Sequence, residues 1–178
     1  MTEIEIKILE INRTQVEEKL RALGAKKVLD DEIHALYYDL PDKRLKISGM
    51  TLRLRKEGRK VVLTLKTDVE NPTAKERKEL ETEVVDFETM RAILEGMLFA
   101  PWLEMKKHRT SYELKGTHFE LDQYHDRYGF IPEFLEIEGR DMETIYHFAE
   151  ALGFSRHDCK PWDAVELAAY YARKDDRS

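Results

Sequence analysis

Near its start the chain reads Glu3-Ile4-Glu5-Ile6-Lys7-Ile8-Leu9, in which charged residues alternate with isoleucine. Because the side chains of a β-strand point alternately to its two faces, this stretch predicts a strand with one charged face and one apolar face. The charged face carries both signs within three positions, at Glu3, Glu5 and Lys7. The apolar face suits a hydrophobic core, and the same alternation recurs along the chain.

The composition indicates one globular domain that spans residues 1–178. Hydrophobic residues make up 42% of the chain and charged residues 37%, which is well above the usual quarter. The net charge is −6 and no basic tail is present. Nucleic acid is therefore not expected as a partner, because neutralising phosphates requires a basic face.

The sequence also limits the compartment and the kind of metal site. No apolar run approaches the length of a membrane span and no signal peptide precedes the first strand, so we expect a cytoplasmic protein with no membrane partner. The single Cys159 excludes an internal disulfide and a Cys-rich metal site.

Periodicity predicts about eight strands with three or four helices between them, an α+β fold. Strands are expected over residues 3–9, 26–40, 50–55, 61–66, 75–85, 105–114, 118–124 and 134–138. Helices are expected after Thr14, Asp86 and Asp141, with a last helix from Pro161. Strands that follow one another through hairpin turns favour an antiparallel sheet or barrel.

Charged residues of one sign recur at alternate positions of these strands. The acidic pairs are Glu3/Glu5, Glu81/Glu83, Glu120/Asp122 and Glu136/Glu138, the basic pairs are Arg53/Arg55 and Lys107/Arg109, and Lys7 and Lys66 stand singly. The simplest interpretation of any one pair is a solvated sheet face with cross-strand ion pairs. The repetition favours another: in a closed barrel this face lines a lumen, and unpaired ions there would each lose several kcal/mol of hydration. Such a lumen must be wet or must hold a highly charged ligand.

A polyphosphate with a divalent cation is a ligand that needs both signs. Arg and Lys bind phosphate oxygens, and carboxylates bind Mg²⁺ or Mn²⁺. The sequence has no glycine-rich phosphate loop and no His/Cys metal spacing. Side chains on the strands must therefore provide the phosphate contacts.

Glu3-Ile4-Glu5-Ile6-Lys7 resembles the ExExK signature of the CYTH family, the triphosphate tunnel metalloenzymes. Further segments follow in family order: Tyr37–Asp42, Gly49–Arg55, Leu65-Lys66, Lys107–Arg109, Glu120–Asp122 and Phe134–Gly139. The resemblance covers nearly the whole chain. It implies a closed antiparallel eight-stranded β-tunnel with flanking helices.

The resemblance also implies roles for individual residues. Triphosphate binding falls to Lys7, Arg53, Arg55, Lys66, Lys107 and Arg109, and Lys160 resembles a late basic residue that reaches the phosphates in some members. Metal binding falls to Glu3, Glu5, Asp122, Glu136 and Glu138, of which Glu3, Glu5 and Glu138 are also the catalytic candidates that orient a water. Glu81, Glu83 and Glu120 are further candidates. Glu79 shares the face of Glu81 and Glu83, so which two of these three belong to the site stays open.

Three functions remain open at this point. The leading hypothesis is metal-dependent hydrolysis of a small-molecule triphosphate, either a nucleoside, thiamine or inorganic triphosphate. The second is a class IV adenylyl cyclase, which makes cyclic AMP and pyrophosphate from ATP and binds the three phosphates in the same way. The third is a non-catalytic polyphosphate or nucleotide-binding protein, against which the intact acidic pairs argue. A monomer and a homodimer are both compatible with the sequence.

Overall fold

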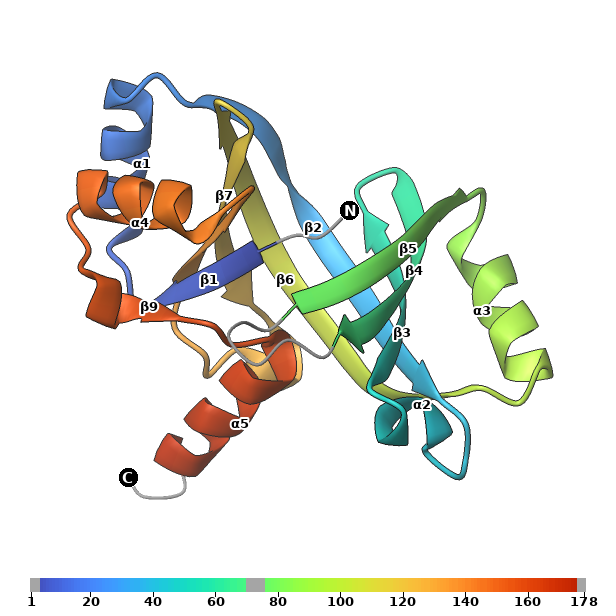
Figure 1. Ribbon diagram of the computed structural model, residues 1–178. Coiled ribbons are helices and arrows are strands. Elements are labelled where there is room, and N and C mark those ends of the chain that lie inside the picture. The colour runs from blue at the N-terminus through green and yellow to red at the C-terminus, as the bar shows by residue number, and fades with distance from the viewer. Residues whose placement is uncertain (1–3, 70–75, 176–178) are drawn as a thin grey trace. The chain divides into compact units, whose positions relative to one another are not determined.

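The computed structural model describes residues 4–69 and 76–175, with an antiparallel nine-stranded sheet and flanking helices (Figure 1). Glu3 lies outside the described residues. The strands are β1 (Ile4–Leu9), β2 (Lys26–Asp39), β3 (Met50–Glu57), β4 (Lys60–Val69), β5 (Glu76–Val84), β6 (Ala100–Leu114), β7 (Thr117–Tyr124), β8 (Phe134–Gly139) and β9 (Cys159–Lys160). The α-helices are α1 (Arg13–Ala22), α2 (Arg44–Ile47), α3 (Phe87–Gly96), α4 (Met142–Ala151) and α5 (Ala164–Asp175).

The order of the strands in the sheet is β5-β4-β3-β2-β6-β7-β8-β1-β9. The predicted α+β class and the antiparallel sheet are confirmed, and β9 adds a ninth strand to the eight expected. The chain divides into two compact units, which we call the first unit (residues 31–106) and the second unit (residues 3–30 and 107–178). Closure of the sheet into a tunnel and a single domain over residues 1–178 stay predictions.

In the first unit, helix α3 covers one face of the sheet. Asp86 caps this helix as predicted, because its carboxylate accepts a hydrogen bond from the backbone N–H of Thr89. The core beneath the helix includes Leu36, Tyr38 and Leu54, with Phe87 and Leu94 from the helix itself.

In the second unit, helices α1 and α4 cover the apolar face of the sheet (Figure 1). Ile6 and Ile8 of β1 are each 1% exposed, as the alternation at the start of the chain predicts. They pack with strand residues and with Leu20 of α1 and Ile145 of α4. The opposite face of β1, which carries Glu5 and Lys7, is consequently turned away from this core.

Several boundaries differ from those predicted, among them the starts of α1, β6 and α5. Helix α1 is capped by Asn12 rather than Thr14, because the Asn12 side chain accepts from the N–H of Gln15. Strand β6 begins at Ala100, five residues early, and accommodates Pro101 near its start, where the missing N–H is tolerated. Helix α5 begins at Ala164 rather than Pro161.

The late start of α5 has a local cause. The carboxylate of Asp163 accepts hydrogen bonds from the backbone N–H groups of Val165 and Glu166, and Glu166 accepts one from the N–H of Asp163. This reciprocal pair is a capping box, which fixes the first turn after Asp163.

None of the helices in the described part of the chain combines the length and hydropathy needed to cross a bilayer. The cytoplasmic location, the lack of a nucleic-acid partner and the choice between monomer and homodimer stay predictions of the sequence.

The buried face of the second unit gives a test of the fold. Leu121 of β7 is fully buried, whereas Leu23, after α1 in the same unit, is 39% exposed. We expect Leu121→Ala to lower the free energy of unfolding by about 2–5 kcal/mol, because it removes buried methyl groups and leaves a cavity. Leu23→Ala, the matched control, should cost less than about 1 kcal/mol. Urea denaturation followed by circular dichroism measures both, and equal losses would contradict this packing.

Candidate functional site

Strand register places charged residues of the second unit in rows across the sheet. Lys7 on β1 lies directly opposite Glu136 on β8 and Lys160 on β9, and Glu136 lies opposite Glu120 on β7. Directly opposed residues of antiparallel strands project to the same face. Four charged side chains from four strands therefore share one row.

Two further rows flank this one. In one, Glu5 lies opposite Glu138, which lies opposite His118. In the other, Asp122 on β7 lies opposite Arg109 on β6. The predicted charged face of the second unit is thus real, and it lies on the side of the sheet away from the core helices.

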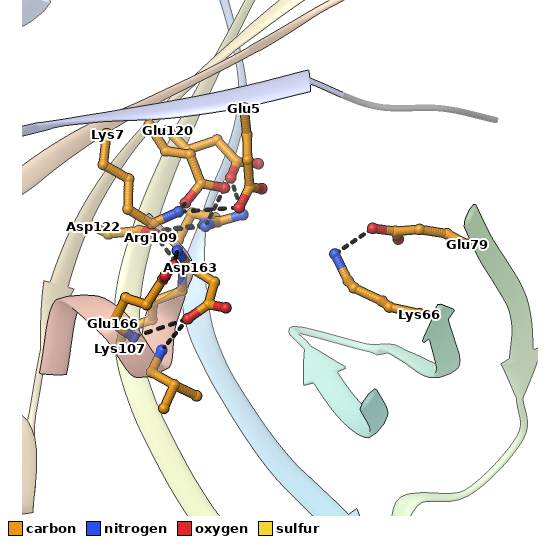
Figure 2. A network of polar contacts seen from close by, with 12 residues as sticks. Glu5, Lys7, Lys66, Glu79, Lys107, Arg109, Glu120, Asp122, Asp163 and Glu166 are labelled. Carbon is orange, nitrogen blue, oxygen red and sulfur yellow. Dashed lines mark hydrogen bonds and ion pairs between the residues drawn. The ribbon is translucent and has the colours of Figure 1, made fainter. Parts of the chain in front are cut away.

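The charged side chains form a continuous network (Figure 2). Arg109 grips Asp122 with two atoms, since its Nε lies 2.7 Å from Oδ1 and its Nη2 lies 2.6 Å from Oδ2. Arg109 also pairs with Glu120 and lies 3.7 Å from Glu136. Lys107 Nζ lies 2.5 Å from Asp122 Oδ2, so Asp122 is shared by two cations.

Lys7 links β1 to the same network. Its Nζ lies 2.7 Å from Glu136 and 3.2 Å from Glu5. Burial alone lowers the pKa of Lys7, but the charges of Glu136 and Glu5 outweigh burial and leave the pKa raised. Lys7 therefore stays a cation although its side chain is 3% exposed.

The two best-paired carboxylates are held ionised. Burial raises the pKa of Asp122, but the charges of Arg109 and Lys107 outweigh it and hold that pKa below its usual range. Burial likewise opposes ionisation of Glu136, and the charges of Lys7 and Arg109 hold its pKa well below the ordinary value. Such buried ions are tolerated only because each has a partner of opposite sign.

Glu120 behaves differently. Burial, reinforced by the charges of Glu136 and Asp122, raises its pKa to about 7 in spite of the neighbouring Arg109. One oxygen from each of these three carboxylates lies within 4.8 Å of the others. This group could hold a metal ion, and a set made only of oxygen donors fits a small hard cation.

The first unit has a charged face of its own. Arg53 on β3 lies opposite Thr64 on β4, which lies opposite Glu81 on β5. In a neighbouring row Lys66 lies opposite Glu79 and forms an ion pair with it (Figure 2). Thr64 Oγ1 donates a hydrogen bond of 3.0 Å to Glu81.

These contacts narrow the choice among the three glutamates of β5. Glu79 contacts Lys66 and Glu81 contacts Thr64, whereas Glu83 lies opposite the apolar Val62. The geometry therefore favours Glu79 and Glu81 as the acidic members of this face. The sequence did not single out Thr64 as a site residue, although it stands two positions before Lys66.

Residues 1–156 of the chain match the sequence family of the CYTH domain. The chain belongs to the CYTH family. A Methanocaldococcus jannaschii protein named “Putative adenylate cyclase” is 27% identical over 176 residues, which are 94% of this chain and 98% of that protein. A solved structure of a Pyrococcus horikoshii protein is 29% identical in sequence. The match covers 93% of this chain and 98% of that chain, with a TM-score of 0.76.

A more distant solved structure shares the fold. It is from Hippeastrum, is described as a “Putative adenylyl cyclase” with a dominant triphosphatase activity, and is 18% identical. The match covers 97% of this chain and 95% of that chain, with a TM-score of 0.64. Both names are those of the related proteins, and the likeness to the Hippeastrum structure shows the shared fold.

The family motif residues fall into three groups in the structure. The second unit brings together Glu5, Lys7, Lys107, Arg109, Glu120, Asp122, Glu136 and Glu138 on one face. The first unit carries Arg53, Arg55, Lys66, Glu81 and Glu83. Lys160 lies opposite Lys7, but its Nζ donates to the backbone oxygen of His157 at 2.8 Å.

The Arg109–Asp122 pair provides a stability test, done in the presence of a chelator. Asp122→Ala leaves Arg109 and Lys107 without their shared buried partner, and we expect a loss of about 3–5 kcal/mol in the free energy of unfolding. The control is Glu150→Ala, which breaks an exposed 3.5 Å ion pair with Arg156 and should cost less than about 1 kcal/mol. Urea denaturation compares them, and a loss at Asp122 no larger than the control would show that the network does not stabilise the fold.

Proposed function

We propose that this CYTH protein is a metal-dependent hydrolase of small-molecule triphosphates. The observation that supports it is the second-unit network, in which Lys7, Lys107 and Arg109 share one buried face with acidic residues. A hydrolase of triphosphates needs cations for the phosphates and carboxylates for a metal and a water. This face has both within a few ångströms.

The cations would bind the phosphate chain by exchanging partners. Arg109 already holds Asp122 through two parallel contacts, and the same planar fork matches two oxygens of a phosphate. Lys7 and Lys107 would act as point charges on either side. Following the family resemblance, Arg53, Arg55, Lys66 and Lys160 are assigned to triphosphate binding as well.

Glu120, Asp122 and Glu136 would hold the metal, which we assign as Mg²⁺ or Mn²⁺. When bound, the ion would neutralise charge on the phosphates during transfer. The partner exchange couples the two ligands. When a phosphate pairs with Arg109, the carboxylates that Arg109 contacted lose their cation, and a metal ion must then compensate their negative charge. Triphosphate and metal should therefore bind together.

The remaining carboxylates would position the attacking water molecule and accept its proton. Glu5, which also contacts Lys7, lies opposite Glu138, so together they can orient one water molecule. The water oxygen forms a bond to the terminal phosphorus while the bond from that phosphorus to the bridging oxygen breaks. The bridging oxygen leaves with the electron pair on the diphosphate part, and Glu138 accepts the proton from the water.

A class IV adenylyl cyclase is the second candidate, supported by the name of the Methanocaldococcus jannaschii relative. In that reaction the ribose 3′-hydroxyl attacks the α-phosphorus and pyrophosphate leaves, with the same grip on the phosphates. The triphosphatase activity described for the Hippeastrum protein favours hydrolysis as the leading candidate. A non-catalytic binding protein is the third candidate.

A product assay separates these candidates. ATP, thiamine triphosphate and tripolyphosphate are incubated with the protein and Mg²⁺ or Mn²⁺, and products are separated by chromatography. We expect orthophosphate and the matching diphosphate, and no turnover in excess EDTA, since the carboxylates that we assign to the metal cannot replace it. Cyclic AMP with pyrophosphate would instead identify the cyclase, and full turnover in EDTA would exclude a metal-dependent mechanism.

Glu138→Gln tests the role of the carboxylate that we assign to the water. It should lower kcat by about 100-fold or more, as expected for loss of a general base. The melting temperature of the metal-free protein should be kept or raised, because the change removes a like charge opposite Glu5.

The matched control is Glu113→Gln. Glu113 lies opposite His118 in the same row as Glu138 but is exposed, so its loss should leave kcat unchanged. If Glu138→Gln unfolds the protein yet the folded fraction turns over normally, this carboxylate is structural and the assignment is wrong.

A further inference from the structure

Aromatic side chains lie at one end of the charged face of the second unit. Lys107 on β6 lies opposite Tyr124 on β7, and Asp122 on β7 lies opposite Phe134 on β8. Directly opposed residues project to the same face, so Tyr124 and Phe134 lie on the face that carries the network. Both are buried, with 4% and 1% of their surface exposed. The charged rows therefore meet two packed rings where β7 ends and β8 begins.

The rings are held by each other and by the loop between these strands. The ring centroids of Tyr124 and Phe134 are 5.8 Å apart with planes tilted by 26°, which is a stacked pair. Tyr128 of the loop lies 6.3 Å from the Tyr124 ring in an edge-on contact. The backbone N–H of Tyr128 donates to His125, and that of Ile131, a buried residue, donates to Tyr128. The loop thus fixes the position of the Tyr124 ring.

The ammonium group of Lys107 lies over the face of this ring. Its Nζ is 5.6 Å from the centroid of Tyr124, and the Lys107 side chain is 14% exposed. The face of an aromatic ring is the negative part of its quadrupole and attracts a cation, most strongly where water is excluded. Lys107 therefore contacts both the carboxylate of Asp122, at 2.5 Å, and the ring of Tyr124.

These two partners of Lys107 differ in what a ligand does to them. In the proposed function Asp122 passes to the metal, and phosphate oxygens take its place beside Lys107. The ring of Tyr124 is neutral, so it attracts the ammonium without competing for the metal or repelling the phosphate. A long side chain without such a contact must be ordered by the ligand itself, which weakens binding about threefold to tenfold.

We propose that Tyr124 is a positioning residue, whose ring holds the ammonium of Lys107 in place for the triphosphate. The inference deepens the proposed function and rests on it, since Lys107 is assigned there to the phosphates. It adds a neutral residue to the charged set, and this residue acts through Lys107 rather than by contact with the ligand.

Calorimetry of ligand binding tests this role. The ligand is imidotriphosphate, an analogue of tripolyphosphate whose P–N–P bridges resist hydrolysis, titrated with Mg²⁺ present. Tyr124→Leu should raise the Kd about threefold to tenfold, because Lys107 then has to be ordered on binding. Tyr124→Phe keeps the ring and should leave the Kd within about twofold of that of the unmodified protein. An equal rise in both variants would show that the ring is not the group that acts.

The matched control is Phe119→Leu, on the same strand. Phe119 is fully buried in the core on the other face of the sheet, where its ring lies 5.2 Å from that of Phe148. This variant also loses a buried ring, so it should lower the melting temperature, yet it should leave the Kd unchanged. If both leucine variants raise the Kd equally, the cause is a general loosening of the sheet and the inference is wrong.

A double-mutant cycle shows whether Tyr124 acts through Lys107. Lys107→Met removes the ammonium but keeps a long unbranched side chain, and it should weaken binding of imidotriphosphate. In this background Tyr124→Leu should have no further effect on the Kd, because the ring has no cation left to hold. The same rise of the Kd in both backgrounds would show that Tyr124 acts by another route.

Tyr124→pentafluorophenylalanine tests the electrostatics of the ring with little change in its packing. Fluorination reverses the quadrupole, so the face of this ring repels an ammonium group. We expect a Kd at least about threefold above that of Tyr124→Phe, which has nearly the same shape. Equal Kd values would show that the ring only fills space. This comparison holds even if Tyr124→Leu does not fold.

The outcomes separate this inference from the proposed function. If the unmodified protein does not bind imidotriphosphate with Mg²⁺, the proposed function fails and the role of Tyr124 fails with it. If it binds but Lys107→Met leaves the Kd unchanged, or Tyr124→Leu binds as tightly as the unmodified protein, Tyr124 is not a positioning residue while triphosphate binding stands.

Discussion

The two-pronged ion pair between Arg109 and Asp122 is the interaction on which the charged face depends. Both side chains are buried, and a buried ion is tolerated only with a partner of opposite sign. This requirement explains why the strands of the second unit carry both signs on one face. Lys107 shares Asp122 and Lys7 is held by Glu136, so each of these cations is compensated from a neighbouring strand.

The same constraint relates the architecture to the proposed chemistry. The buried ions of this face are paired with one another. If one partner alone is removed, the other is left as an unpaired buried charge. A triphosphate and a metal ion entering together can replace the internal pairs, because phosphate oxygens take the cations and the metal takes the carboxylates. Burial is the main cause of the raised pKa of Glu120, about 7, and the charges of Glu136 and Asp122 add to it.

Much of this could be predicted from local sequence, and the rest required strand pairing. The alternation around Ile6 predicted the first strand and its two faces, and Asp86 predicted the start of α3, because both signals act within a few residues. The choice of Glu79 and Glu81 over Glu83 depends on which residues of β4 lie opposite, and register is not fixed by the spacing within one strand. The raised pKa of Glu120 likewise arises where side chains from several strands meet.

The most direct test of the central claim is a crystal structure with Mg²⁺ and imidotriphosphate. The account predicts phosphate oxygens on Lys7 and Arg109, with the cation on Asp122 and Glu136 and the two-pronged Arg109–Asp122 contact opened or shared with the ligand. A triphosphate bound elsewhere, with that contact unchanged and no cation on the carboxylates, would show that the charged face is a structural network and would contradict the account.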